Sequence, residues 1–335
     1  MRAMLLSKPA PVETAPLQAT TVEVPEPADD EVLVKVRTCG VCRTDLHVVE
    51  GELPPHKLPL IPGHQIVGIV ARLGSACSRV RVGQRVGIAW LRKTCGHCAF
   101  CTAGKENLCE SSTYTGYDAD GGYAEYAVAP EAFLYPIPDS FDDVSAAPLL
   151  CAGIIGYRAL QRCNLQTNGI LALYGFGASA HLVFQIAQHR GHKLFVVSQG
   201  EHHQEAAREL GANWVGADPA KMPEPADAAI IFAPAGWLVL PALESLKKGG
   251  TLVLAGIYMS EIPPLNYDRH LFYERDVRTV TANTREDAQG LLLEAAKIPV
   301  RVRTCLYPLE KANQALLELK AGKIQGSAVL QVSAT

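Results

Sequence analysis

The sequence lacks three features that would point away from a compact globular protein. No window is an uninterrupted apolar stretch of about 20 residues, the length a membrane-spanning helix needs, and the apolar run near Met1 is too short for a signal peptide. The net charge is only −3, with neither a basic stripe for nucleic acid nor an acidic tail. No internal repeat or low-complexity tract is evident. These absences favour a cytoplasmic protein that binds neither nucleic acid nor membrane.

The chain is long enough for two domains. Its 335 residues are 48% hydrophobic and 19% charged, an ordinary proportion for a globular protein with a sizeable core. Up to about residue 150, short β-branched runs such as 31–36 and 66–71 are separated by Gly and Pro. This pattern predicts a β-rich first unit with many turns.

From Gly169 onward, apolar strand-like runs alternate with helical patterns, which is typical of a doubly wound parallel sheet. We expect strands at 170–174, 193–198, 228–233 and 250–255, and helices at 178–190 and 201–210. After about residue 298, a strand at 300–305, a helix at 309–321 and a strand at 327–332 should return the chain to the first unit. The prediction is an α/β protein with one domain formed by 1–152 and 288–335 and another by 153–287.

The sequence has ten cysteines, and four of them fall within fifteen positions: Cys95, Cys98, Cys101 and Cys109. Reducing conditions disfavour structural disulfides, so clustered thiols indicate a metal or catalysis. Four thiolates leave no open coordination position, which predicts a structural site. Tetrahedral sulfur ligands fit zinc or an iron–sulfur centre. We interpret His97, inside the loop, as a bystander.

Three further residues have the chemistry of metal ligands but lie far apart in the chain: Cys42, His64 and Cys151. Two thiolates and one imidazole leave a fourth position for water or substrate, the pattern of catalytic zinc. Spacing alone does not unite them. Taken singly, His64 reads as a satisfied histidine and Cys151 as a small buried hydrophobe.

A glycine-rich turn follows the predicted strand 170–174. Gly175 and Gly177 stand where a cofactor pyrophosphate would approach the backbone, and Ala180 supplies the small side chain that helix–strand packing requires. At the end of the next strand, an NAD-selective site usually has Asp or Glu, but here the position is Ser198. The arginine expected for NADP is missing too, so Gln199, His202 and His203 would have to serve. We favour NADP over NAD.

These motifs together resemble the zinc-containing medium-chain alcohol dehydrogenases over essentially the whole chain. The most specific are Gly-Val-Cys-Arg-Thr-Asp at 40–45, Pro-Gly-His at 62–64, the loop at 95–109 and Gly-Gly-Tyr-Ala-Glu-Tyr at 121–126. The resemblance implies a GroES-like β-rich catalytic domain and a Rossmann cofactor domain. It also implies that Cys42, His64 and Cys151 bind a catalytic zinc, and that the metal of the four-cysteine loop is a second zinc.

The resemblance also implies roles for the neighbours of these ligands. Thr44 and His47 match a relay that carries the alcohol proton to solvent, and Asp45 is the expected carboxylate partner of His64. Trp90 matches a position that narrows the alcohol pocket, to which Leu91 and Tyr114 could contribute. Two further expected contacts with the cofactor are Arg43 for the pyrophosphate and Ile257 for the nicotinamide.

One position departs from the family pattern. A glutamate usually follows the ligand histidine, and Gln65 stands there instead. Because an amide is neutral, we expect a more electrophilic zinc and altered ligand exchange. We regard Cys39, Cys77, Cys163 and Cys305 as packing thiols.

The expected function is reversible hydride transfer between a small alcohol or aldehyde and NAD(P), by a homodimer or homotetramer. A related dehydrogenase of polyols or aldehyde adducts stays open, as does a non-catalytic redox sensor that binds zinc and nucleotide. A zinc-free quinone reductase is disfavoured because every ligand position is filled.

Overall fold

A mixed sheet forms the core of the first part of the chain in the computed structural model, which describes residues 1–333. The strand order is β16-β17-β3-β4-β5-β9, with β8 pairing β3; all pairs are antiparallel except β16 with β17. Eight of the eleven residues of β3 are buried, and its β-branched valines are of the type that packs well on a pleated sheet. The strands are β3 (Glu31–Val41), β4 (Gln65–Leu73), β5 (Arg85–Ile88), β8 (Tyr126–Pro130), β9 (Leu134–Pro136), β16 (Thr304–Pro308) and β17 (Ser327–Gln331).

Two small hairpin-like sheets and several short helices complete this unit. The small sheets are β1 (Arg2–Leu6) with β2 (Leu17–Thr21), and β6 (Leu91–Lys93) with β7 (Thr113–Tyr114). The α-helices are α1 (Arg43–Glu50), α2 (Ala99–Thr102), α3 (Asp143–Ala146), α9 (Arg285–Ala295) and α10 (Ala312–Lys320). The 3-10 turns are η1 (Val12–Thr14), η2 (Glu106–Leu108), η3 (Glu131–Phe133), η4 (Ala147–Leu150) and η7 (Leu309–Lys311).

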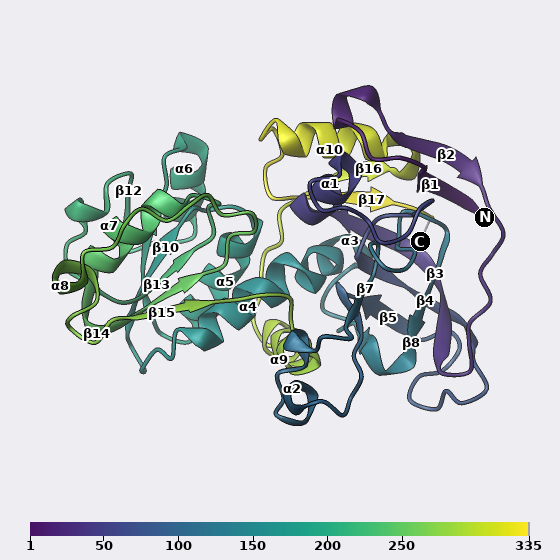
Figure 1. Ribbon diagram of the computed structural model, residues 1–335, viewed down its shortest axis with the longest axis horizontal. Helices are drawn as coiled ribbons and strands as arrows, with labels where there is room; N and C mark the ends of the chain where they lie inside the picture. Colours follow the sequence, from purple (N-terminus) through teal and green to yellow (C-terminus); the bar gives the residue numbers. More distant parts are fainter. Residues whose placement is uncertain (334–335) are drawn as a thin grey trace. The chain divides into compact units, whose positions relative to one another are not determined.

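The second unit is a six-stranded parallel sheet in the order β12-β11-β10-β13-β14-β15 (Figure 1). Every residue of β10 is buried, as expected for a strand covered on both faces. The strands are β10 (Ile170–Tyr174), β11 (Lys193–Val197), β12 (Trp214–Gly216), β13 (Ala226–Ile231), β14 (Leu246–Leu254) and β15 (Asp276–Thr279). The helices are α4 (Ala152–Arg162), α5 (Ala178–His189), α6 (Glu201–Glu209), α7 (Val239–Glu244) and α8 (Tyr267–His270), with 3-10 turns η5 (Pro219–Lys221) and η6 (Gly236–Leu238).

The chain divides into two units along these lines. The first comprises Met1–Cys151, Ala282–Ala296 and the chain from Arg301 onward, and the second comprises Ala152–Thr281 with Lys297–Val300. The chain therefore leaves the first unit after Cys151, returns to it at Ala282, and enters the second unit again briefly at Lys297–Val300. The prediction of a β-rich unit beside a doubly wound parallel sheet is confirmed.

Three expected elements begin three or more residues away from the observed start. The strand expected at 300–305 begins only at Thr304, because its parallel partner β17 starts at Ser327, directly opposite Thr304. The helix expected at 309–321 opens with the turn η7 and becomes α-helical at Ala312. β14 begins at Leu246 rather than Gly250, because its first residue already pairs with Ala226 across a register shift.

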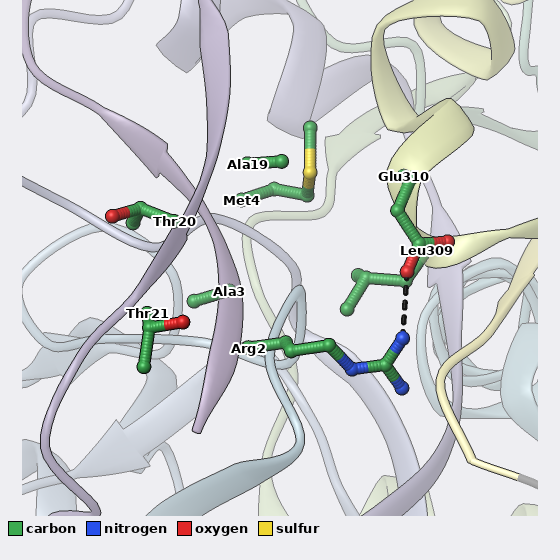
Figure 2. A pocket seen from close by; sticks show the side chains of 8 residues that line it. All are labelled: Arg2, Ala3, Met4, Ala19, Thr20, Thr21, Leu309 and Glu310. Carbon is green, nitrogen blue, oxygen red and sulfur yellow. Dashed lines mark hydrogen bonds and ion pairs between the residues drawn. The ribbon is translucent and has the colours of Figure 1, made fainter.

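Two findings concern the surface. Among residues 1–333, no single helix is long and apolar enough to cross a membrane; one bent pair, 143–150 with 152–162, passes that test by length and composition only. An open cavity of about 400 Å³ lies beside β1, β2 and η7 (Figure 2). The ion pair of Arg2 Nη1 with Glu310 Oε1, at 2.8 Å, lies at its side. None of the predicted site residues lines this cavity.

Candidate metal centres and cofactor site

The fold of the first unit brings Cys42, His64 and Cys151 together. Cys42 follows β3 and is the N-cap of α1, His64 directly precedes β4, and Cys151 follows the turn η4. Their ligand atoms all lie within 4.8 Å of one another, and the two Sγ atoms are 3.7 Å apart. Residues separated by 109 positions thus form one cluster.

The donor set of this cluster fits a tetrahedral zinc ion. Two zinc–sulfur bonds of about 2.3 Å at a tetrahedral angle place the sulfurs about 3.8 Å apart, close to the observed 3.7 Å. His64 Nε2 is fully buried and has no hydrogen-bond partner among the described residues. Leaving such an atom unpaired costs about 1–3 kcal/mol, so the arrangement suits an imidazole whose free nitrogen binds a metal. Three protein donors leave a coordination position open.

Asp45 fixes the orientation of His64. Both side chains are 1% exposed, and the Nδ1 of the imidazole donates to Asp45 Oδ1 at 2.9 Å. The other carboxylate oxygen accepts from the backbone N–H of Cys42 at 2.8 Å and from the hydroxyl of Tyr123 at 3.2 Å. One carboxylate therefore holds two members of the cluster and directs Nε2 toward the sulfurs. The sequence motif at 121–126 contained Tyr123, but only the fold shows this contact.

The pKa values of the cluster residues are shifted by their neighbours. The hydrogen bond from Cys151 lowers the pKa of Cys42 well below its ordinary value, against the opposing effect of burial, and His64 lowers it further. Burial by itself would lower the pKa of His64, but the charge and hydrogen bond of Asp45, with help from Cys42, raise it to about 10. The hydrogen bond to Cys42 and burial raise the pKa of Cys151 well above its ordinary value, so metal binding at this cluster is coupled to proton release.

The residues of the expected proton relay lie on α1. Thr44 is buried, and its Oγ1 lies 3.7 Å from Cys42 Sγ. His47 is on the next turn, three residues along the same helix, and positions three apart share a helix face. Its Nδ1 pairs with the carboxylate of Glu52, whose side chain is half exposed. Thr44 beside the cysteine cluster and His47, which pairs with the half-exposed Glu52, therefore lie three residues apart on one helix.

Aromatic side chains form a wall beside His64. Trp90 meets the imidazole edge-on, with ring centroids 5.0 Å apart, and stacks on Tyr114 at 5.0 Å and 19°. Tyr117 completes the group at 5.8 Å from Trp90. The sequence pointed to Trp90 and Tyr114 but not to Tyr117, for which it carried no signal. Leu91, by contrast, is fully buried in the core.

Gln65 is buried at the start of β4 and packs against the backbone of the neighbouring strand. A Cβ at Gly40 would lie 2.8 Å from the amide carbon of Gln65, so the glycine makes room for this side chain. The amide is 4% exposed. A neutral group therefore occupies a buried position adjacent to His64 in the sequence.

The four-cysteine loop forms the second cluster. The ligand atoms of Cys95, Cys98, Cys101 and Cys109 lie within 4.8 Å of one another, and the first and third sulfurs are 3.9 Å apart. Backbone N–H groups within the loop donate to the sulfurs, and those of His97 and Cys98 lower the pKa of Cys95 to about 6. His97 Nδ1 bonds to the carbonyl of Cys95 instead of joining the sulfurs. Four sulfurs at these separations fit a closed tetrahedral site.

An ion pair anchors this loop to α9. Glu106 is 6% exposed, and its carboxylate accepts from the backbone N–H of Arg285 at 2.7 Å and from the guanidinium Nη2 at 2.6 Å. The guanidinium also lies over the ring of Phe133, 4.7 Å from its centroid. Burial raises the pKa of Glu106, but the hydrogen bonds and charge of Arg285 outweigh it and lower the pKa overall. Sequence patterns gave no sign of this pair, whose members are 179 positions apart.

The second unit carries the glycine-rich turn between β10 and α5. Gly175 has a φ of 84°, and a Cβ there would lie 3.1 Å from the backbone nitrogen of Ala233. Gly177 is the N-cap of α5, has no side-chain cap, and a Cβ there would meet nothing within 4 Å. Ala180 is fully buried. The open, uncapped N-terminus of α5 fits the pyrophosphate of a dinucleotide.

The end of β11 holds the residues expected at the adenosine ribose. Ser198 is buried, and its carbonyl accepts from the amide of Gln204 at 2.7 Å. Gln199 directs its amide to the carbonyl of Ala217 at 3.3 Å. No carboxylate follows the strand at 198–200. Further along the unit, Ile257 is 45% exposed after β14.

Comparisons with known proteins agree with this geometry. Residues 28–139 match the family described as alcohol dehydrogenase GroES-like domain, and residues 180–297 match the zinc-binding dehydrogenase family. The chain is 51% identical to the probable alcohol dehydrogenase AdhA of Mycobacterium tuberculosis over 99% of this chain and 97% of that protein. It is 37% identical to an alcohol dehydrogenase of Geobacillus stearothermophilus, covering 95% and 96% of the two chains.

A solved structure shows the same fold throughout. The thermostable alcohol dehydrogenase from Pyrobaculum aerophilum superposes with a TM-score of 0.89 at 27% identity, and the match covers 99% of each chain. The matched family domains and the full-length relatives span both units of the fold. The chain therefore belongs to the zinc-binding medium-chain alcohol dehydrogenase family.

Proposed function

We propose that this protein is a zinc-dependent alcohol dehydrogenase that transfers a hydride reversibly between a small alcohol and NAD(P). The buried, unpaired Nε2 of His64 beside two thiol sulfurs is the observation that carries the proposal. Cys42, His64 and Cys151 would hold the catalytic zinc, with Asp45 positioning the imidazole. A bound zinc supplies Lewis acidity, which makes an alcohol hydroxyl more acidic and polarises a carbonyl in the reverse reaction.

The chain's own residues would handle the proton that the alcohol loses. The Thr44 hydroxyl can both accept and donate a hydrogen bond, as a relay requires. His47 can take the proton because a neutral imidazole can act as a general base. Its Nδ1 pairs with the carboxylate of Glu52, whose side chain is half exposed. The wall of Trp90 and Tyr114 favours slender or flat substrates, which supports primary or aromatic alcohols and the matching aldehydes.

We assign the cofactor to the turn between β10 and α5. Gly175 and Gly177 would admit the pyrophosphate, and Ala180 would keep the helix close to the sheet. Arg43 is exposed and makes no ion pair with any described residue, so it is available for the pyrophosphate. Ile257 would contact the nicotinamide. In this proposal, residues 1–152 and 288–335 form the catalytic domain, and residues 153–287 form the cofactor-binding domain.

The end of β11 supports a proposal about which nucleotide binds. Ser198 and Gln199 bring no negative charge to the ribose, so a 2′-phosphate meets no carboxylate there. This supports a preference for NADP over NAD. A strong preference for NAD in kcat/KM would overturn it.

We further propose a second zinc in the four-cysteine loop, with a structural role. Four thiolates would fill its coordination sphere and leave no place for substrate. We also propose that the protein assembles as a homodimer or homotetramer, which light scattering after gel filtration would measure.

Metal analysis combined with an absorbance assay tests the central proposal. The protein as purified should contain two zinc ions per chain and should reduce NADP+ or NAD+ with a panel of primary and aromatic alcohols. Two zinc ions with tight cofactor binding but no turnover on any alcohol or aldehyde would instead indicate a redox sensor. Turnover confined to polyols or aldehyde adducts would identify a related dehydrogenase.

A further inference from the structure

Two adjacent histidines lie where the second strand of the parallel sheet ends. His202 and His203 belong to the first turn of α6, and their ring centroids are only 3.9 Å apart. Both rings fold over Gly200: a Cβ there would lie 3.3 Å from an atom of each imidazole. The backbone of Phe176, in the middle of the glycine-rich turn, acts to raise the pKa of His203. The pair therefore bridges the ribose end of β11 and the pyrophosphate turn within one unit.

No permanent cation competes for this position. Between Ser198 and Ala207 the sequence contains neither lysine nor arginine. The amide of Gln199 is directed toward the carbonyl of Ala217. The first arginine along α6, Arg208, donates to the side chain of Gln204. The two imidazoles are thus the groups in 198–207 that can acquire a positive charge.

We propose that His202 and His203, when protonated, bind the 2′-phosphate of NADP, so that the discrimination between NADP and NAD depends on pH. This inference rests on the proposed assignment of the cofactor to the turn between β10 and α5. In this arrangement the histidine pair takes the place of the usual arginine. Its positive charge is not permanent but is stabilised by the bound phosphate.

Proximity couples the two rings. Two imidazolium ions at 3.9 Å repel each other, so in the free protein protonation of one opposes protonation of the other. Burial lowers the pKa of His203, the charge of His202 lowers it further, and the backbone of Phe176 opposes both. A 2′-phosphate, which is mostly dianionic above about pH 6, would stabilise both charged rings. Binding should then take up protons, and affinity should fall as pH rises through the neutral range.

The other charged or titratable groups around the pair are already engaged or exposed. On α6, Glu201 and Glu205 are exposed. From α5, His181 packs edge-on against Phe176 with ring centroids 6.2 Å apart. After β12, the Asp218 carboxylate accepts from the backbone of Ala220 at 3.0 Å, and Lys193 at the far end of β11 pairs with Glu224. Among the described residues, His202 is the titratable group whose charge shifts the pKa of His203.

Fragments of the cofactor isolate the 2′-phosphate from the rest of the molecule. We would measure binding of 2′,5′-ADP and 5′-AMP to the zinc-loaded protein by calorimetry between pH 6.5 and 8.5, at constant ionic strength and in buffers of different ionisation enthalpy. We expect 2′,5′-ADP to lose about tenfold in affinity over this range. Near pH 7 it should also take up between about half a proton and one proton more than 5′-AMP does. The affinity for 5′-AMP should stay constant.

Substitutions test the assignment of the effect to the pair. His202→Gln and His203→Gln keep a hydrogen-bonding side chain but cannot become charged, so each should reduce both the pH dependence and the proton uptake. His189→Gln, an exposed histidine at the end of α5, is the matched control and should leave both unchanged. Gln199→Arg supplies a permanent cation and should hold the 2′,5′-ADP affinity high at pH 8.5.

Two results would overturn the inference, and they are distinguishable. The first concerns the double variant that carries both His202→Gln and His203→Gln. If this variant still binds 2′,5′-ADP more tightly than 5′-AMP, with the same pH dependence as the unsubstituted protein, the pair is not the phosphate site, while the NADP preference stands. If the two fragments bind equally at every pH, the inference and the NADP preference both fail. The alcohol dehydrogenase activity is judged separately with NAD+.

Discussion

The two cysteine clusters of this protein use the same ligand chemistry in opposite ways. In the loop at 95–109, four sulfurs come from one short segment, and its metal site would be closed. In the other cluster, Cys42, His64 and Cys151 come from three parts of the fold, and one position stays free. His64 and its carboxylate partner are almost fully buried, whereas His97 of the loop is exposed. An open coordination position and a buried supporting carboxylate, not cysteine content, therefore distinguish the proposed catalytic site from the proposed structural site.

Removing a ligand from the dispersed cluster should have the largest effect. Cys151→Ala should abolish the binding of one zinc and lower kcat/KM by roughly 10³-fold or more, because Lewis-acid stabilisation of several kcal/mol is lost. The loop should keep its own zinc and the protein should stay folded. Zinc content by mass spectrometry, kinetics and circular dichroism would measure this. Retained activity with one zinc per chain would break the comparison.

The matching change in the loop should affect stability instead. Cys98→Ala should remove the other zinc and lower the midpoint of thermal unfolding by at least roughly 4 °C, since about 2 kcal/mol or more of local folding energy comes from the metal. At 25 °C, kcat/KM should change less than about tenfold. Scanning calorimetry and limited proteolysis of the loop would test it. A loss of activity as large as that of Cys151→Ala would show that the loop is part of the active site.

A substitution of Asp45 should have an effect of intermediate size, confined to the dispersed cluster. Asp45→Asn keeps the shape but weakens the hold on Nδ1 of His64 and on the backbone of Cys42. The affinity of the dispersed site for zinc should fall about 10–100-fold, while the loop site is unchanged. Competition with a chromogenic chelator would resolve two classes of zinc. Asp118→Asn, which alters a carboxylate paired with His56 outside both clusters, is the control and should leave both classes as they are.

The proton relay should contribute less than the metal ligands. His47→Ala should slow turnover by about tenfold and flatten the rise of kcat with pH, because a general base contributes only part of the rate. Zinc content should not change. Restoration of the rate by imidazole in solution would support the relay. A total loss of activity with both zinc ions present would contradict a role of this modest kind.

The anchor of the loop should give the smallest effect. The pKa of Glu106 is lowered in the folded protein, so its bond to Arg285 stabilises the protein above the ordinary carboxyl value of 4.5 and is lost as pH falls below it. Glu106→Gln should therefore lower thermal stability slightly at pH 7, by about 1 kcal/mol, and remove part of the decline on acidification below about pH 4.5. Unfolding midpoints measured from pH 7 to pH 3.5 would show the two curves converging. Parallel curves would mean that the pair does not hold the loop.

The sequence predicted local features well. The thiols at 95–109 needed no fold to be associated, because a short segment with glycine turns can bring its own side chains together. The strand at 170–174 and the glycines after it were predicted for the same reason, since their pattern has a short period and a defined turn. The strand at 300–305 was misplaced because its limits depend on a partner more than twenty positions away.

For the dispersed cluster, the sequence indicated which residues could be metal ligands but not how close together they lie. Cys42, His64 and Cys151 were found by resemblance, and nothing in their spacing states that their ligand atoms lie within 4.8 Å. The same holds for Tyr123 on Asp45, Tyr117 on Trp90 and the ion pair of Glu106 with Arg285. Such contacts join strands and helices that only the packed sheet brings together.

By itself, the sequence therefore determined the fold class, the four-cysteine loop and the glycine turn, because each depends on neighbours within a few residues. Tertiary structure alone decided which nitrogen of His64 is free, that Tyr123 supports its carboxylate partner and that Glu106 pairs with Arg285. The physical reason is the distance along the chain over which each kind of interaction acts. Turn geometry and periodicity act along the chain, whereas burial, charge and hydrogen bonding act through space and take their values from the whole fold.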